Sequence, residues 1–532
     1  MATTVVVSPG SRKVATQSQR QRPDWLFAGG LVTLLTLLAF AVHGYHPYAE
    51  DGGLYIAGIK RVLDPGMYPH HSEFVLEHLR FSVFAPMVAA IVRGSGLSLE
   101  VVLLLLQLVT FWMTLFAGWM LVSRCYSQRE ARVGSVALLA VWLTLPIAGT
   151  SLMLMDPYVT ARSISTPSAL FALVGALAFL TPQDSTLAER RRGLALCIVS
   201  LALAAMVHPL MAGYALACVL ALAAAVPLER KTRTLASIGL FVGGMGTAMA
   251  IQSVSLPENT AYLRVAMTRS YWFLSEWHWY EWIGVAAPLL ILGWIATGRR
   301  HEDNGERTVL ARMALVIGTT AMVVALLFAR EGLASHLVAR LQPLRVFQLV
   351  YVVMILVLGA EVAKHMLRRH AMRWTAVFTV LATVMFLAER QTFPASAHFE
   401  LPASLRSNAP GNAWVQAFLW VRQNTPKDAL LALDADYITK PGEDAQSFRA
   451  IAERSALPDY SKDGGETSIT PELTGAWLEG QAAQSRLSDT TDTQRIAALK
   501  PLGVGWVVLE RKAATSFVCG FANEAVKVCR LP

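Results

Sequence analysis

The chain has 532 residues, of which 54% are hydrophobic and only 16% are charged. Soluble globular domains are about one quarter charged, and apolar runs of roughly 20 residues recur along this chain, so the composition excludes an ordinary soluble protein. It indicates a polytopic helical membrane protein. The net charge of +9 does not indicate nucleic acid, because the basic residues cluster in short loops where they set membrane orientation.

The N-terminal residues 1–22 are polar and basic, with Arg12, Lys13, Arg20 and Arg22. We expect a disordered tail in the cytoplasm, because such a segment cannot bury a core and basic flanks stay inside. The apolar run that follows is long and has no small-residue cleavage site behind it, which favours an uncleaved span over a signal peptide.

Eleven membrane-spanning helices are expected if every basic cluster between apolar runs lies in the cytoplasm. This places the N-terminus inside, the C-terminal region outside, and a transmembrane domain over residues 23–390. The predicted spans are 25–44, 98–123, 133–151, 164–181, two within 193–227, 235–254, 282–297, 308–329, 342–363 and 373–389.

Two segments need a separate interpretation. The run 193–227 is interrupted by His208-Pro209, and proline removes a helical donor, which predicts the outer turn of a hairpin. Residues 81–93 are apolar but too few to cross a bilayer. We expect them to form a helix lying in the outer interface, within an external loop over 45–97.

Residues 391–532 are more polar and predict a small extracytoplasmic α/β domain. The segment NAWVQAFLWVRQNTPKDALLAL is typical of a helix, a turn at Asn424-Thr425-Pro426 and a strand, while GVGWVVLERK and AVKVCRL are typical of two strands. Cys519 and Cys529 lie where a disulfide is permitted; the alternative is two small buried side chains.

The acidic pair Glu50 and Asp51 stands just beyond the first span, followed by two glycines and an amphipathic segment that ends before Asp64-Pro65-Gly66. Carboxylates at a membrane edge are costly unless they have a role. One interpretation is a functional site, and the other is that the pair caps the helix that follows. The glycines allow close approach of backbone or ligand.

External basic residues near a span are exceptions to the orientation rule and therefore candidate anion ligands. Arg345, at the outer edge of the tenth span, is the foremost candidate, because a phosphate would suit its fork of donors. Snorkelling, or a pair with Glu331, is the alternative. The remaining candidate phosphate-binding residues are Arg162, Arg264, Arg269 and His208.

Other chemistry has little support in the sequence. The first external loop contains four histidines, His46, His70, His71 and His78, but no metal-ligand spacing, so no metal cofactor is expected even though a divalent ion is conceivable. The aromatic segment 270–282 is typical of an interfacial belt, with sugar stacking as an alternative. No phosphate-binding glycine loop or nucleophile elbow is present.

The multispan body, the motif AEDGGLYIAGIKRV after the first span and the C-terminal domain together resemble the GT-C glycosyltransferases, such as protein mannosyltransferases and lipid A aminoarabinose transferases. The resemblance implies an all-α polytopic membrane protein of a bacterial inner membrane, with Glu50 and Asp51 at the positions of the family's acidic residues. The context HPYAEDGG departs from the well-studied members.

The resemblance also implies a reaction. A polyprenyl-phosphate sugar would donate to an acceptor glycan, lipid or protein on the extracytoplasmic side. Asp51 would act as general base or orient the acceptor hydroxyl, with Glu50 assisting, and Arg345 and Arg162 would hold the phosphate. Alternatives are a non-catalytic envelope-assembly protein of the same fold and a lipid or solute transporter. A transporter should carry charges near the bilayer midplane, where these spans have almost none.

Overall fold

The computed structural model describes residues 25–181, 186–226, 229–297, 305–405 and 409–532. The tail predicted over 1–22 lies outside the described residues. The described chain is mostly helical, and a small sheet lies near its C-terminal end.

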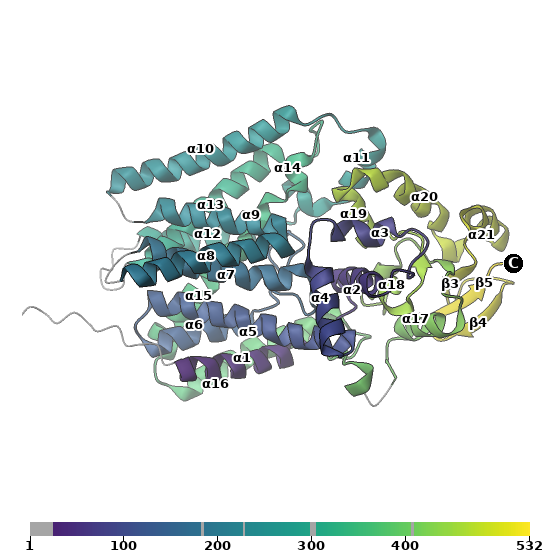
Figure 1. Cartoon of the computed structure of the whole chain (residues 1–532), viewed down its shortest axis with the longest axis horizontal. Coiled ribbons are helices and arrows are strands. Elements are labelled where there is room, and N and C mark those ends of the chain that lie inside the picture. Colours follow the sequence, from purple (N-terminus) through teal and green to yellow (C-terminus); the bar gives the residue numbers. More distant parts are fainter. Residues whose placement is uncertain (1–24, 182–185, 227–228, 298–304, 406–408) are drawn as a thin grey trace, which may run out of the picture.

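The body of the molecule is a bundle of long helices that lie side by side (Figure 1). A helix is present at each of the eleven segments where the sequence predicts a span. They are α1 (Trp25–His43), α5 (Leu99–Cys125), α6 (Arg129–Val141), α7 (Ala161–Leu180), α8 (Leu187–Val207), α9 (Pro209–Ala225), α10 (Arg230–Val254), α12 (Trp279–Thr297), α13 (Glu306–Phe328), α15 (Phe347–Val362) and α16 (Ala371–Thr392).

Eight helices in the described part of the chain are long and apolar enough to cross a membrane, and a ninth span results if one bent helix pair is counted. The helices α6, α8 and α9 are not among the eight, because α6 and α9 are short and the first turns of α8 are charged. The structure is therefore that of a multi-pass helical membrane protein, and the number eleven stays a prediction.

The prediction of a continuous span over 133–151 is wrong in its second half. The helix α6 ends at Val141, and the chain then turns back on itself, with Pro146 pairing with Met153. Proline has no N–H to continue a helix, and Ala148 and Ser151 have positive φ angles. This irregular stretch forms part of the cavity described below.

Close backbone contacts hold the bundle together. A Cβ on Gly175 of α7 would lie 2.5 Å from the Gly193 carbonyl oxygen of α8, so the two helices touch through their backbones, as small residues permit in membranes. The helix α15 is almost wholly buried, whereas α10 and α16 lie at opposite outer faces and expose apolar side chains (Figure 1). That exposure fits contact with lipid.

The first predicted external loop folds into short helices beside one end of the bundle (Figure 1). They are α2 (Glu50–Leu63), α3 (Glu73–Leu76), η1 (Glu77–Leu79) and α4 (Phe84–Ser95). The amphipathic helix predicted before Asp64 is confirmed as α2, although it begins at the acidic pair itself. The apolar segment predicted over 81–93 is the helix α4, and it makes an angle of 94° with the helical segment before it.

Short elements join the remaining long helices. The predicted break at His208 is confirmed, because α8 ends at Val207 and α9 begins at Pro209. The connecting elements are α11 (Thr260–Met267), η2 (Ser270–Trp272), η3 (Leu274–Glu276), α14 (Leu337–Arg340), η4 (Pro343–Val346) and the π-helical turn η5 (Ala363–Leu367).

The C-terminal part, residues 409–532, is a five-stranded mixed sheet with helices around it, and it lies at the same end of the bundle as α2 and α3 (Figure 1). The strand order is β2-β1-β3-β5-β4, parallel from β2 to β3 and antiparallel beyond. The strands are β1 (Leu430–Ala432), β2 (Ser455–Ala456), β3 (Trp506–Glu510), β4 (Val518–Ala522) and β5 (Val526–Arg530).

The helix and strands predicted from the C-terminal sequence are confirmed. The helix is α17 (Ala413–Asn424), and the predicted strands are β1, β3 and β5. The other helical elements before β3, in chain order, are η6 (Ala403–Leu405), η7 (Tyr437–Thr439), α18 (Phe448–Ala452), α19 (Lys462–Ile469), η8 (Pro471–Leu473), α20 (Thr474–Gln484), η9 (Leu487–Asp489), α21 (Asp492–Leu499) and η10 (Lys500–Leu502).

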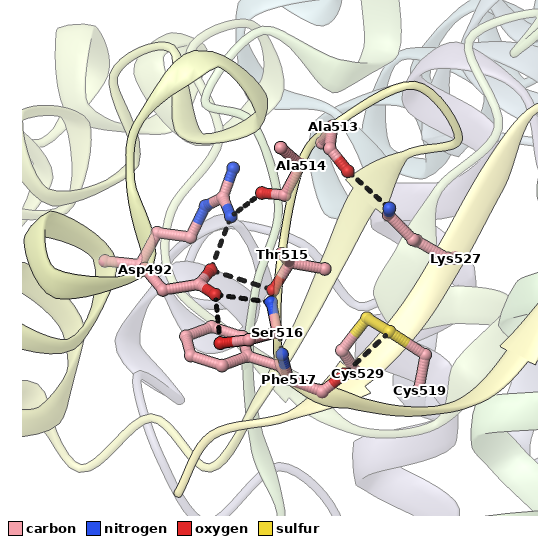
Figure 2. The surroundings of a disulfide bond; sticks show 10 residues. Asp492, Ala513, Ala514, Thr515, Ser516, Phe517, Cys519, Lys527 and Cys529 are labelled. Carbon is pink, nitrogen blue, oxygen red and sulfur yellow. Dashed lines mark hydrogen bonds and ion pairs between the residues drawn. A yellow bond between two sulfur atoms is a disulfide. The ribbon is translucent and has the colours of Figure 1, made fainter.

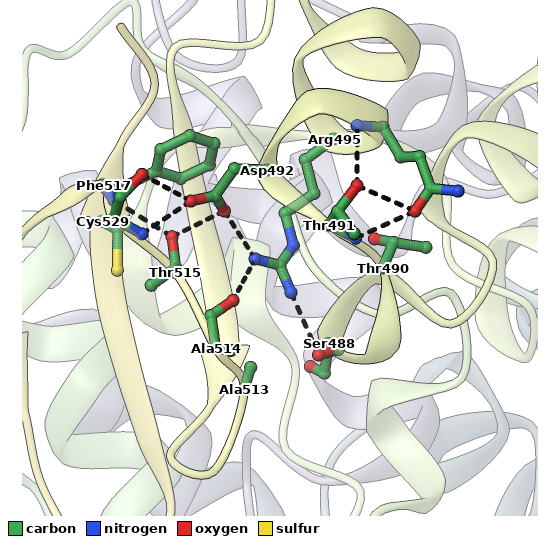
Figure 3. Close-up of polar contacts among 12 residues, drawn as sticks. Ser488, Thr490, Thr491, Asp492, Arg495, Ala513, Ala514, Thr515, Phe517 and Cys529 are labelled. Atoms are coloured by element: carbon green, nitrogen blue, oxygen red, sulfur yellow. Dashed lines mark hydrogen bonds and ion pairs between the residues drawn. The ribbon is translucent and has the colours of Figure 1, made fainter.

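Covalent and polar links secure the edge of this sheet. Cys519 of β4 and Cys529 of β5 form a disulfide (Figure 2), which is the first of the two alternatives left open by the sequence. Nearby, Arg495 of α21 is fully buried and donates to Asp492 and to the carbonyl oxygens of Ser488 and Ala514 (Figure 3). Asp492 in turn accepts from the loop before β4.

The C-terminal part is anchored directly on α2. Lys60 of α2 donates to the Ala450 carbonyl oxygen at 2.8 Å and to Glu453 at 2.6 Å. A Cβ on Gly53 would lie only 2.1 Å from the Ser447 side chain and 2.6 Å from the Tyr48 carbonyl oxygen. The glycine therefore permits the close approach that the sequence suggested, and it brings α18 and α19 over the acidic pair.

Candidate functional site

A cavity of about 630 Å³ lies where the bundle, the first loop and the C-terminal part meet. Three distant regions of the chain build its wall: α2 with η1, the ends of the long helices, and α19. Among the residues predicted from the sequence, those that line it are Glu50, Asp51, Arg162, His208, Arg269 and Arg345. Arg264 of α11 is exposed and is not part of the cavity wall.

Glu50 and Asp51 occupy the first turn of α2. Neither side chain nor that of Ala49 caps the helix by a hydrogen bond, although the carboxylates lie at the favourable end of the helix dipole. Glu50 has a φ of 51°, a left-handed conformation that is uncommon outside glycine and concentrates at functional sites. Its N–H donates to the Ala445 carbonyl oxygen at 2.8 Å, so contact with the C-terminal part stabilises this conformation.

Asp51 is held by two cations from opposite sides. Its Oδ2 accepts from Arg162 of α7 at 2.9 Å, and its Oδ1 accepts from Lys462 of α19 at 3.1 Å. Lys462 also forms an ion pair with Glu50. One lysine from the C-terminal part thus bridges both members of the acidic pair.

These contacts keep Asp51 ionised. Burial by itself would raise the pKa of Asp51, but the charges and hydrogen bonds of Lys462 and Arg162 outweigh burial and hold that pKa well below its usual range. Burial would lower the pKa of Lys462, yet the two carboxylates raise it instead. Each Asp51 oxygen retains a second lone-pair position that can accept a hydrogen bond from a substrate hydroxyl.

Arg162 connects the pair to a third carboxylate. Its second terminal nitrogen donates to Asp156 at 3.0 Å, and both side chains are buried. Burial raises the pKa of Asp156, whereas Arg162 opposes that shift. Because Arg162 is engaged by two carboxylates, most of its charge is compensated within the protein.

Arg345 differs from Arg162 in having no anionic partner among the described residues. It belongs to η4, immediately before α15, and its guanidinium forms no hydrogen bond or ion pair with any described residue. Its Nε is buried without a partner, and its guanidinium carbon lies 5.9 Å from the centre of the Tyr271 ring. Glu331, which the sequence offered as a partner, is instead hydrogen-bonded to Ser275.

The other predicted basic residues have different surroundings. Arg269 is buried, and its terminal nitrogens donate to the carbonyl oxygens of Ser461 and Tyr460 at 2.8 and 3.0 Å. It therefore ties the bundle to α19. His208 accepts from the Met211 N–H at 3.5 Å through Nδ1 and caps α9.

Lys462 and Glu466 are cavity residues that the sequence did not suggest. They lie in the segment SKDGGETSI, whose glycines and small polar residues are typical of a loop and do not indicate a functional site. The sequence feature that could have linked Lys462 and Glu466 is their spacing of four residues, because on a helix it places both side chains on one face. That spacing alone does not indicate which partner the face meets.

The aromatic and histidine-rich segments have mixed roles. Tyr271 lines the cavity beside Arg345, while Trp272 and Trp277 are buried in the core. His46, which lies in the predicted external loop, is fully buried and stacks on Phe393 with ring centres 4.1 Å apart. Across the described ranges, no three His, Cys, Asp or Glu side chains are grouped to hold a metal ion.

No protein-family model and no curated protein matches this chain.

Proposed function

We propose that this chain is an integral membrane glycosyltransferase, which transfers a sugar from a polyprenyl-phosphate donor to an acceptor on the extracytoplasmic side. The observation that carries the proposal is the meeting of Asp51, Arg162 and Arg345 in one cavity. They come from the first loop and from the ends of two different helices. The GT-C resemblance implies the same three groups.

The free guanidinium of Arg345 is suited to the donor phosphate. A bidentate pair with phosphate supplies strong, directional hydrogen bonds. The phosphate would supply the anionic partner that Arg345 lacks among the described residues. Tyr271 would flank the sugar or the phosphate. No metal is required for this contact.

The reaction exchanges one bond at the anomeric carbon. The acceptor oxygen bonds to that carbon, the bond from the carbon to the phosphate oxygen breaks, and the hydroxyl proton passes to a base at the cavity wall and then to solvent. The phosphate leaves with the electron pair, and Arg345 stabilises its charge. Asp51 orients the acceptor hydroxyl and does not act as the general base, because its ion pairs with Arg162 and Lys462 lower its affinity for a proton.

The membrane arrangement that accompanies this function has eleven crossings in a GT-C-like body. The N-terminus is cytoplasmic, the C-terminal part is extracytoplasmic, and the protein resides in a bacterial inner membrane. Support comes from the basic residues between the spans, and from the position of α2 and the C-terminal part at one end of the bundle.

One observation favours a second candidate, a non-catalytic envelope-assembly protein of the same fold. Lys462 and Arg162 satisfy Asp51 with ion pairs, which is also how a purely structural carboxylate would be held. In that case the acidic pair would serve to dock the C-terminal part and would not contact substrate.

A transfer assay separates the two candidates. The purified protein, reconstituted into membranes from its native cells, is offered a panel of radiolabelled polyprenyl-phosphate hexoses and pentoses. Label should move to an acceptor, and Asp51→Asn should slow transfer about 100-fold, because the acceptor hydroxyl loses the group that orients it. Undiminished transfer by a folded Asp51→Asn variant would remove Asp51 from the site. Absence of transfer from every donor would favour the non-catalytic candidate.

A further inference from the structure

Glu466 is a second carboxylate in the cavity, and its role is not explained by the contacts of the acidic pair. It lies four residues after Lys462 on α19, so both side chains share one face of the helix and line the cavity. Lys462 is occupied by Glu50 and Asp51. The Glu466 carboxylate forms no hydrogen bond or ion pair with a described residue.

The charges that face Glu466 are mainly negative. Asp51 of α2, Glu77 of η1 and Asp463 of α19 itself all act on it, and together with burial they raise the pKa of Glu466 from 4.5 to about 8. Burial is the largest cause. Tyr55 of α2 lies within the same electrostatic neighbourhood.

Cations near α19 are already committed to other partners. Lys462 is paired as described, and Arg269 donates to carbonyl oxygens at the start of α19. Arg264 on the adjoining α11 is exposed, and so are Glu472 of η8 and Glu479 of α20. His78 of η1 also lines the cavity, and its two ring nitrogens are buried without a described partner.

We propose that Glu466 is the general base of the sugar transfer and accepts the proton of the acceptor hydroxyl, while Asp51 remains ionised and orients that hydroxyl. This inference rests on the proposed glycosyltransferase function. A carboxylate that faces the cavity and has no partner in the described part of the chain can reach a substrate proton, whereas both Asp51 oxygens already accept from cations.

The proton balance of the step is complete with these groups. The acceptor oxygen bonds to the anomeric carbon, the carbon–phosphate-oxygen bond breaks, and the electron pair stays on the polyprenyl phosphate. The hydroxyl proton moves to a Glu466 carboxylate oxygen, and solvent removes it after the product leaves. A base is most effective when its proton affinity is near the working pH, which a carboxylate in this environment achieves.

The assignment also places the acceptor. Gly465, Ile469 and Thr470 line the cavity together with Glu466, so the acceptor hydroxyl enters along α19. The C-terminal part thereby supplies a reacting group and is more than a cover.

The test compares Glu466→Gln with wild type in the reconstituted transfer assay across pH 5 to 9. We expect kcat to fall about 100-fold or more, while the affinity for polyprenyl phosphate without a sugar stays unchanged. In the wild type, kcat/KM should rise with pH up to about 8, and this rise should vanish in Glu466→Gln. The matched control is Glu479→Gln, an exposed residue on α20, which should keep the wild-type profile.

If Glu466→Gln does not fold, as judged by its melting temperature, the same assay is done with Glu466→Asp. The shorter carboxylate should slow transfer and retain the pH-dependent rise. Wild-type turnover and pH profile in a folded Glu466→Gln variant, or unchanged turnover in Glu466→Asp, would overturn the proposal. Failure of the wild type to transfer any sugar would instead overturn the proposed function, and this inference with it.

Discussion

Lys462 of the C-terminal part donates a hydrogen bond to Asp51 at 3.1 Å, across a separation of 411 residues. Through this contact the C-terminal part completes the cavity, because the same helix also carries Glu466. The small C-terminal α/β domain therefore contributes charged groups to the candidate site.

Replacing Lys462 should weaken the attachment of α19 to α2. Lys462→Met removes an ion pair to Glu50 and Asp51 that is only partly exposed, and we expect a loss of about 1–2 kcal/mol in the free energy of unfolding, reduced by solvent screening. Thermal unfolding in detergent measures the change. Lys500→Met, at an exposed position, is the control, and equal stability of the two variants would contradict a joining role for Lys462.

Replacing Arg345 should weaken donor binding. Arg345→Ala should lower the affinity for polyprenyl phosphate about 10- to 100-fold, because hydrogen bonds to charged groups contribute about 1.5–3 kcal/mol. Arg345→Lys should give an intermediate affinity, since lysine keeps the charge and loses the fork of donors. Calorimetric titration measures binding. Arg264→Ala, outside the cavity, should bind as wild type does, and an equal loss there would indicate a diffuse charge effect.

A methyl group at Gly53 should disturb the contact between α2 and the C-terminal part. In Gly53→Ala the new Cβ would meet Ser447 and the Tyr48 carbonyl oxygen, and such overpacking costs about 1–3 kcal/mol. Gly94→Ala is the matched control, because that glycine is also helical and has nothing within 4 Å of its added Cβ. The control should be neutral or slightly stabilising. Equal melting temperatures for the two variants would refute this account of Gly53.

The contribution of Glu466 to the stability of the protein should fall as the pH rises from about 4.5 to about 8. Glu466 ionises near 4.5 in the unfolded chain and near 8 in the folded protein, so the folded state binds more protons between these values and loses stability through this group as they dissociate. Glu466→Gln removes the carboxyl group whose ionisation destabilises the folded protein. It should be more stable than wild type at pH 8, with the difference shrinking towards pH 5. A difference that is independent of pH would show that Glu466 titrates normally.

The orientation of the chain can be tested by labelling in intact cells. A cysteine introduced by Lys500→Cys should react with a membrane-impermeant maleimide, because we expect the C-terminal part outside. One introduced by Arg191→Cys, near the start of α8, should react only after permeabilisation. Both positions are exposed, and the free cysteines Cys125, Cys197 and Cys218 are buried. The reverse pattern would invert the proposed topology.

Local features of the sequence determined the long helices of this protein and several details of its backbone. Apolar runs predicted the long helices, the His208-Pro209 pair predicted the break between α8 and α9, and the glycines after Asp51 predicted a close approach. These features depend on hydropathy over neighbouring residues and on the backbone properties of glycine and proline, which the sequence displays directly. Asp51, Arg162 and Arg345 were found for a related reason, since a charge at a membrane edge stands out from its surroundings.

Only the tertiary structure decided which of these charges are paired. Lys462 and Glu466 lie on a short polar helix with no apolar periodicity to mark it, and the contact of Lys462 with α2 joins residues more than 400 positions apart. Whether an arginine is compensated, as Arg162 is, or free, as Arg345 is, depends on the same kind of long-range contact. Charge pairing is a matter of distance in space and of burial, and neither is encoded by position along the chain.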